Sequence, residues 1–96
     1  MDVEALRGSL AVAEPPAGLN LAAQALWWDA KGDWNKAHQC AQEQEDETGA
    51  WVHAYLHRKE GDAANAGYWY RRAGKPAASV SLDDEWDAIA RAVIGA

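Results

Sequence analysis

Two glycine–aspartate pairs, Gly32-Asp33 and Gly61-Asp62, interrupt an otherwise helical pattern of apolar residues. Glycine accepts the left-handed backbone that ends a helix, and the aspartate after it can cap the first amides of the next helix. On either side of these pairs, apolar side chains recur every three or four positions, which is the period of an amphipathic helix. No segment alternates with the period of two that a half-buried strand needs. The chain is therefore predicted to be all-α.

The helix breaks divide the 96-residue chain into an N-terminal arm and one helical domain. Pro15 and Pro16 cannot continue a helix, so residues 1–18 are expected to form a loosely packed arm and a proline-rich linker. Residues 19–96 are expected to form a single domain with two antiparallel helical hairpins. The expected elements of this domain are a hairpin at 19–44, a hairpin at 49–73 and a capping helix at 82–94.

The charge and cysteine content narrow the classes of partner. A net charge of −6 and a pI of about 4.8 argue against binding to nucleic acid or to an anionic membrane, because both need a basic surface. The single cysteine, Cys40, excludes an intrachain disulfide and is typical of a reducing cytoplasm. No apolar run approaches the ~20 residues that span a bilayer, and the first ten residues lack a signal-peptide pattern. A cytoplasmic protein is expected.

The chain has six tryptophans and no phenylalanine. Trp27 and Trp28 lie about 100° apart around a helix, so they cannot share one face. One of the pair is expected to pack on the N-terminal arm or to be exposed. The tryptophans that fall on apolar faces, and are predicted to be in the core, are Trp28, Trp34, Trp51, Trp69 and Trp86.

His53, His57 and Glu60 follow one another at helical spacing, so one helix face presents two imidazoles and a carboxylate. His38 adds a fourth donor if the helices pack suitably. One interpretation of this pattern is a metal-binding protein or a metal-dependent hydrolase. The glutamate base of a zincin motif is absent, because Ala54 follows His53. The interpretation favoured by the sequence is that these are surface or groove histidines hydrogen-bonded to helix ends or to an acidic loop, with no metal and no cofactor.

Basic side chains gather in residues 58–75, which carry five Lys or Arg and two acidic residues, a local charge of +3. Such a patch can receive a carboxylate or an acidic peptide. The alternative is that these side chains pair with the chain's own acidic run at 43–47. The residues predicted to form a binding surface on exposed helix faces are His53, His57, Arg58, Asn65, Tyr68 and Arg72.

The strings KGDWNKA at 31–37 and EGDAANAGYWYRRAGKP at 60–76 resemble the tetratricopeptide-repeat pattern. In that pattern a Gly-Asp turn precedes a helix that carries alanine, an aromatic residue four positions later and a second alanine. The second string matches better; the first has Ala41 where the aromatic residue would stand, and the period is 29 residues where 34 is usual. The resemblance covers residues 20–76 and implies an array of helical hairpins that binds a protein or peptide.

The string from Trp51 to Gly74 is also similar to a family of small, uncharacterised bacterial proteins, which implies no activity. Together, these patterns favour a bacterial, non-enzymatic interaction module that binds a protein or peptide, with an acidic partner as one candidate, as a monomer or homodimer. The third interpretation is a structural homo-oligomer that makes contact through an exposed tryptophan and Val93-Ile94.

Overall fold

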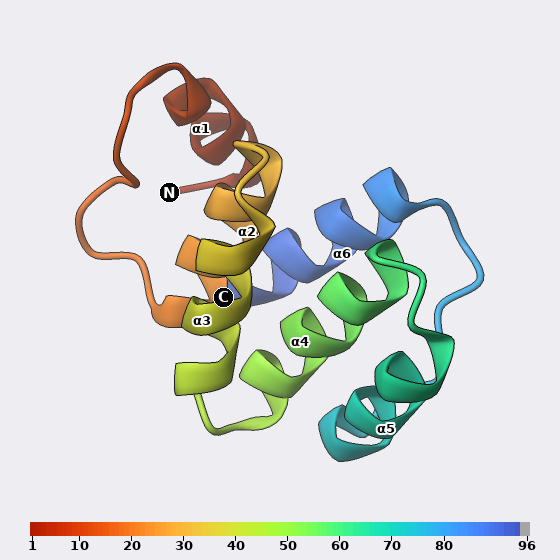
Figure 1. Ribbon diagram of the computed structural model, residues 1–96. Helices are drawn as coiled ribbons and strands as arrows, with labels where there is room; N and C mark the ends of the chain where they lie inside the picture. The colour runs from red at the N-terminus through yellow and green to blue at the C-terminus, as the bar shows by residue number, and fades with distance from the viewer. Residues whose placement is uncertain (95–96) are drawn as a thin grey trace.

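The computed structural model describes residues 1–94, and these residues fold entirely into helices and connecting loops (Figure 1). The all-α prediction is confirmed for this part of the chain; residues 95–96 of the predicted domain lie outside the described residues. None of the described helices is long and apolar enough to cross a bilayer. The elements are α1 (Val3–Gly8), a 3₁₀ turn (Ser9–Ala11), α2 (Leu21–Ala30), α3 (Trp34–Glu43), α4 (Glu47–Lys59), α5 (Ala63–Ala73) and α6 (Leu82–Ile94).

The two Gly-Asp turns have the same geometry. Gly32 and Gly61 have φ of 89° and 90°, a left-handed backbone that glycine adopts without a steric penalty. The Asp33 carboxylate accepts a hydrogen bond from the Lys36 amide at 3.1 Å, and Asp62 repeats this contact one turn into α5. The predicted breaks between α2 and α3 and between α4 and α5 are therefore confirmed.

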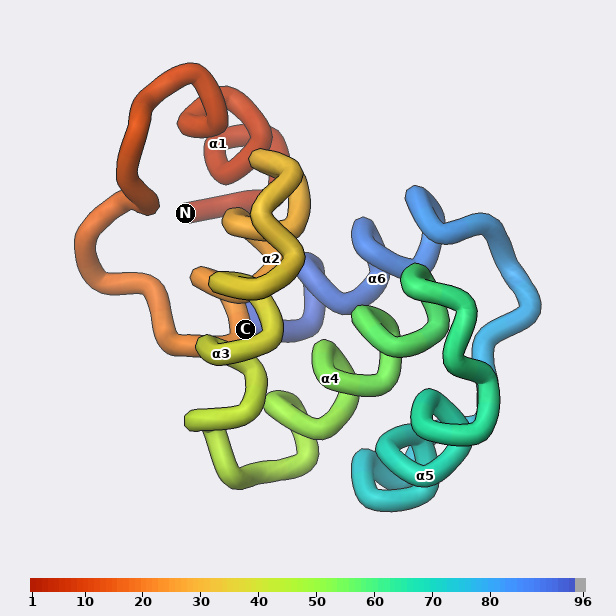
Figure 2. Tube along the Cα trace, viewed as in Figure 1, coloured from red at the N-terminus to blue at the C-terminus, as the bar shows by residue number. Residues whose placement is uncertain are grey.

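Helix α4 is the centre of the molecule and contacts α2, α3, α5 and α6. Helix α1 lies at one end and contacts α6, and α5 lies at the other end beside α4 (Figure 1). After α5 the chain returns, so that α6 lies along α4 and α2 (Figure 2). The largest side chains that are fully buried between these helices are Leu6, Leu26, Trp27, Val52, Leu56 and Ile89.

The first turn of α4 packs tightly on the preceding loop. Asp46 begins the helix by accepting the Gly49 amide at 2.8 Å, so α4 starts at Glu47, two residues before the predicted hairpin. A Cβ added at Gly49 would lie only 1.9 Å from the carbonyl oxygen of Gln44. Only glycine fits at this position.

The N-terminal arm is firmly attached, contrary to prediction. Val3 and Leu6 are buried in the main core, and α1 contacts α6. Beyond α1, the indole nitrogen of Trp27 donates to the Ser9 hydroxyl at 3.0 Å, and the Lys31 ammonium donates to the Leu10 carbonyl at 2.7 Å. These contacts join residues far apart in the sequence, which is why helical periodicity did not reveal them.

The tryptophan predictions need correction. Trp86 is buried as predicted, and Trp27 is fully buried against the arm. The other four tryptophans are only partly buried and pack around the core rather than within it. Lysine side chains cover some of them, with the Lys36 ammonium 4.2 Å from the centre of the Trp28 ring. The four corrected residues are Trp28, Trp34, Trp51 and Trp69.

Two buried carboxylates fix α4 against its neighbours. Asp29 of α2 accepts a hydrogen bond from the Tyr55 hydroxyl at 3.0 Å and pairs with the Lys59 ammonium at 2.8 Å. Glu85 of α6 accepts from the guanidinium of Arg58 at 2.8 Å and from the Tyr70 hydroxyl. Among the described residues, no buried side-chain nitrogen or oxygen lacks a hydrogen-bond partner. A buried charge that is paired in this way holds the helices in one arrangement.

Candidate functional site

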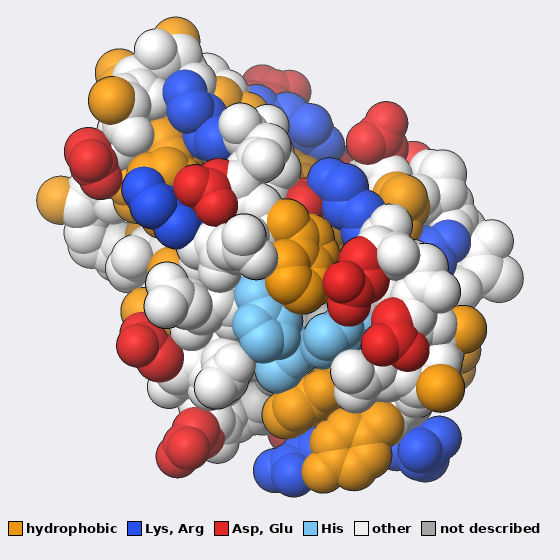
Figure 3. All heavy atoms as spheres, in the orientation of Figure 1, with side chains coloured by type: hydrophobic (Ala, Val, Ile, Leu, Met, Phe, Trp, Pro, Cys, Tyr) orange, Lys and Arg blue, Asp and Glu red, His pale blue; other side chains and the backbone are white. Residues whose placement is uncertain are grey.

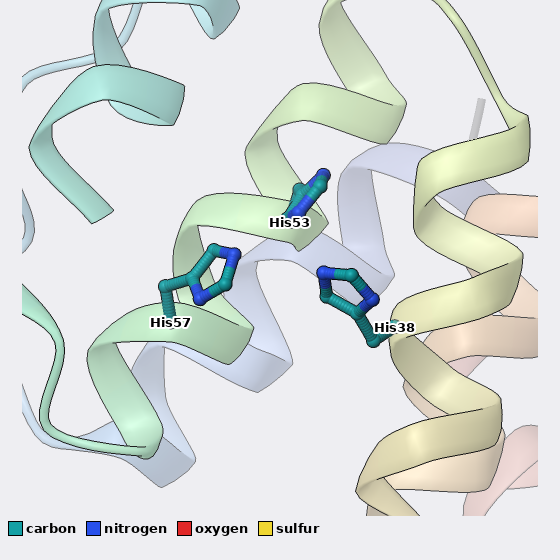
Figure 4. Close-up of side chains that lie close together, drawn as sticks. All are labelled: His38, His53 and His57. Atoms are coloured by element: carbon teal, nitrogen blue, oxygen red, sulfur yellow. The ribbon is translucent and has the colours of Figure 1, made fainter. Parts of the chain in front are cut away.

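The chain has three histidines, and all three converge between α3 and α4 (Figure 4). His38 comes from α3, while His53 and His57 lie one turn apart on α4. The ring centres are 4.5 Å apart for His38 and His53, 5.3 Å for His38 and His57, and 4.8 Å for His53 and His57. One nitrogen of each ring lies within 4.8 Å of the others. We call His38, His53 and His57 the histidine cluster.

Trp34 positions the ring that α3 contributes. It lies one helical turn before His38, and the two rings stack at 4.9 Å. The Trp34 indole nitrogen donates to the backbone carbonyl of Leu56 at 2.9 Å, which ties the start of α3 to α4. The edge of Trp34 also meets His57, with 5.9 Å between ring centres. The spacing of His38 from Trp34 therefore aims the imidazole at α4.

Trp69 of α5 covers the opposite side of the histidine cluster. Its ring stacks on His53 at 3.8 Å with only 15° between the planes, and the guanidinium of Arg72 lies 5.2 Å from the Trp69 ring centre. On the face of the molecule in Figure 3, imidazole atoms reach the surface with hydrophobic side chains above and below them. The cluster thus has aromatic walls but is open to one side.

The structure buries two residues that were predicted to lie on an exposed binding surface. His53 and His57 are only 4% and 7% exposed, because α3 and α5 cover the face of α4 that carries them. Within residues 1–94, the rings of His38 and His53 make no hydrogen bond, yet no fully buried side-chain nitrogen there lacks a partner. The ring nitrogens of these two histidines therefore reach solvent.

A polar groove of about 650 Å³ opens beside His53, between the α3–α4 loop and α5. We call it the α3–α5 groove. Trp69 and Arg72 form its α5 side, while Gln42, Gln44 and the acidic residues that follow form the opposite side. Through His53, the histidine cluster adjoins a space large enough for a small molecule.

Glu60 holds the ring of His57. Its carboxylate lies 2.6 Å from Nδ1 of His57, and the carboxylate side chain is 38% exposed. The other nitrogen of His57 points toward the space shared with His38 (Figure 4). A carboxylate on one imidazole nitrogen fixes the tautomer and leaves the other nitrogen's lone pair available to a ligand.

Two of the imidazoles resist protonation. Burial, followed by the neighbouring His38 and His57, lowers the pKa of His53 from 6.5 to about 4. Burial and then His57 lower the pKa of His38, against an opposing effect of Glu60. At neutral pH both rings are uncharged, so their lone pairs are available.

A second group of donors shares His57 with the histidine cluster. One donor atom of each of His57, Glu60 and Asp62 lies within 4.8 Å of the others. Both carboxylates are exposed, and Asp62 already caps α5 through the Asn65 amide. The sequence predicted a metal site of His53, His57 and Glu60, with His38 as an additional donor. The histidine cluster contains His38 but not Glu60, and the second group contains Glu60 but not His53.

The remaining predicted binding residues differ in how exposed they are: one is held in an ion pair, and three lie on the surface. Arg58 is half-buried and pairs with Glu85 at 2.8 Å, so it is less exposed than predicted. Asn65, Tyr68 and Arg72 are exposed on α5, and the Arg72 guanidinium donates to the Tyr68 hydroxyl at 3.1 Å. Among the ion pairs of the described residues, none joins the basic segment to the acidic run at 43–47.

Cys40 takes no part in the histidine cluster. It is partly buried against the main core, and burial followed by Glu43 raises the pKa of its thiol. A protonated thiol is a poor nucleophile and a poor metal ligand at neutral pH.

Helical periodicity predicts Trp34 and Trp69 in the core and does not indicate that they stack on the imidazoles. One signal was present, since Trp34 precedes His38 by four residues, the spacing at which helical side chains meet. Nothing comparable marked Trp69, which reaches His53 from a different helix.

Comparison with protein-family models, with curated proteins and with solved structures gives no match.

Proposed function

We propose that this protein binds a divalent transition-metal ion, of which Zn²⁺ is the best example, through His38, His53 and His57. The observation that carries the proposal is that every histidine of the chain lies in one cluster, drawn from two helices. Imidazole nitrogen is a preferred ligand of Zn²⁺, Cu²⁺ and Ni²⁺, and three imidazoles form a well-known type of zinc site.

The distances are close to those that zinc needs. Four-coordinate zinc has Zn–N distances of about 2.0–2.1 Å, which places its ligand nitrogens about 3.3 Å apart. The cluster already holds its nitrogens within 4.8 Å of one another. Small ring rotations close the remaining gap, since all three side chains project from helices whose backbones stay in place.

Charge also favours a metal over protons. The low pKa values of His38 and His53 mean that a metal ion does not have to displace protons from them at neutral pH. The Glu60 carboxylate contacts Nδ1 of His57, which orients the ring with its other nitrogen toward the space shared with His38.

Calorimetric titration of the untagged chain with ZnSO₄ tests the proposal. One equivalent should bind, and zinc at about 100 times its Kd should stabilise the fold by about 2.7 kcal/mol, a rise in Tm of roughly 10–20 °C. Absence of binding heat together with an unmoved Tm would overturn the proposal.

Three variants identify the ligands. His38→Gln should lose most of the affinity, whereas Glu60→Gln should weaken binding by about 10- to 100-fold, as expected for a group that orients a ligand. Asp62→Asn is the matched control, because asparagine keeps the helix cap and removes only the charge. If Asp62→Asn loses zinc while His38→Gln retains it, the ion binds to the group of His57, Glu60 and Asp62 instead.

We also propose that the fold is a pair of tetratricopeptide-like hairpins. The matching dihedral angles of the Gly32-Asp33 and Gly61-Asp62 turns support it, as do the extensive contacts of α2 with α3 and of α4 with α5. An experimental structure in which α2–α3 superposes on α4–α5 would bear this out.

A second candidate function is peptide binding on the exposed side of α5. Tyr68 is 46% exposed and lies beside Arg72, which forms no ion pair within the described residues. An exposed aromatic ring next to arginine is a common composition for a binding surface, and the positive charge favours an acidic segment. With Arg58 held by Glu85, this surface is smaller than the sequence predicted.

A further inference from the structure

We infer that a zinc ion in the histidine cluster keeps one open coordination position and hydrolyses small uncharged esters that enter the α3–α5 groove. This inference rests on the proposed metal binding and adds a reaction to it. It depends on three features: the number of ligands, their charge and the space beside them.

The chain supplies three ligands to the cluster and no fourth. Among the described residues, no further histidine, cysteine, aspartate or glutamate lies within reach of all three imidazoles. The Glu60 carboxylate contacts Nδ1 of His57 rather than the nitrogens that face the other two rings. Zinc sites with four protein ligands are structural, whereas those with three hold water at the fourth position and are catalytic.

The charge of the ligands determines how acidic that water becomes. Three neutral imidazoles leave the full positive charge of the ion uncompensated, whereas thiolates or carboxylates would cancel part of it. Zinc held by three histidines lowers the pKa of its bound water from about 9 for the aqueous ion to about 7. Hydroxide is then abundant near neutral pH, and it needs no separate general base.

The α3–α5 groove offers a substrate a place beside His53, the one member of the histidine cluster that lines it. His53 is both a ligand and a wall of the α3–α5 groove, and Trp69 stacks directly on it. The Trp69 ring already contacts the His53 imidazole and the Arg72 guanidinium, so an acyl or aryl group meets only the remaining part of the indole that lines the groove. Arg72 and Gln42 provide N–H donors in the same groove. A volume of about 650 Å³ accommodates a small ester. The acidic residues Glu45 and Glu47 on the opposite wall disfavour an anionic substrate.

The proposed reaction consumes ester and water. The bound water gives one proton to the buffer, and the resulting hydroxide oxygen forms a bond to the carbonyl carbon as the carbonyl electron pair moves onto oxygen. When that pair returns, the bond between the carbonyl carbon and the alcohol oxygen breaks. The alcohol oxygen takes a proton from solvent, the new carboxylic acid gives its proton to the buffer and leaves as the carboxylate, and a new water binds. Nothing is oxidised or reduced.

Hydrolysis of 4-nitrophenyl acetate by the zinc-loaded chain tests this inference. The second-order rate constant should exceed that of the chelator-treated chain at least tenfold, and it should rise with pH to a plateau with a midpoint near pH 7. The chelator-treated chain measures any attack by the imidazoles themselves. Equal concentrations of ZnSO₄ without protein measure the reaction of the free ion.

Variants separate the site from the rest of the surface. His38→Gln should reduce the zinc-dependent rate to that of the chelator-treated chain. Arg91→Gln changes an exposed residue of α6 that does not line the groove, and it should leave the rate unchanged. If calorimetry shows one bound zinc but the rate does not exceed the chelator-treated baseline, the inference is overturned and metal binding stands. If no zinc binds, both proposals fail.

Discussion

Acidification should destabilise the metal-free protein through His53. In the unfolded chain this imidazole takes a proton near its ordinary pKa of 6.5, but in the fold it does so only near 4. Between these two values the unfolded state binds more protons than the folded state. Stability must therefore fall as the pH falls through this window, and the loss is complete below the folded-state pKa.

The size of the effect follows from the two pKa values. They correspond to a loss of about 2 kcal/mol at about pH 5, and about 3 kcal/mol at still lower pH. The ring nitrogens reach solvent, which reduces the penalty, so a loss of about 1–2 kcal/mol between about pH 8 and about pH 5 is expected. For a domain of this length, that loss lowers Tm by roughly 5–15 °C. His38 contributes in the same direction, because its pKa is also lowered.

Thermal melts followed by circular dichroism, with a chelator present, measure this dependence across the pH range. His53→Gln is the comparison, because glutamine retains a polar side chain and cannot titrate. The variant's Tm should change much less with pH than that of the natural chain, whatever its absolute value. Asp46 and Asp87 have lowered pKa values and titrate below this window. Parallel pH profiles for the two proteins would refute the reasoning.

Two further changes test the packing and the surface. Gly49→Ala should destabilise the fold by about 3 kcal/mol or more in chemical denaturation, because its Cβ would collide with the Gln44 carbonyl oxygen at 1.9 Å. Gly67→Ala is its matched control, with the nearest atom at 3.6 Å, and should be neutral or stabilise α5 by up to about 1 kcal/mol; equal losses would contradict this assignment. Combining Arg72→Glu with Tyr68→Ala should leave Tm within a few degrees and weaken binding to an acidic peptide array at least tenfold. A large fall in Tm with unchanged peptide binding would assign both residues to the fold.

The helix boundaries were predictable because they depend on local interactions. The glycine and aspartate of each turn act within four residues, through a left-handed backbone and a side-chain cap, so the sequence alone carries the information. The packing of α1 was not predictable in this way. Leu6 is fully buried because α2 and α6 come to it from elsewhere in the chain, and a short helix before two prolines gives no sign of that.

The candidate site was predictable only where it depends on spacing within one helix. The spacing of His53 and His57 places them on one face of α4 whatever surrounds that helix. Whether His38 joins them depends on how α3 crosses α4, and their burial depends on α3 and α5 covering that face. Amphipathic periodicity predicts polar, exposed imidazoles, whereas in the structure Trp34 stacks on His38 and Trp69 stacks on His53.

The histidine cluster is not what holds α4 in place. The Asp29 carboxylate joins α2 to α4 through Tyr55 and Lys59. The Glu85 carboxylate joins α6 to α4 through Arg58 and to α5 through Tyr70, and none of these contacts uses an imidazole.

Burying imidazoles that resist protonation lowers the free energy of unfolding at acid pH. The fold tolerates this loss because the Asp29 and Glu85 contacts stabilise the packing of the helices independently. It follows that loss of metal and loss of fold are separable in this protein. Replacing His38 or His57 should remove the ion while leaving the helices assembled, whereas breaking the Glu85 contacts should unfold the chain with the three imidazoles intact.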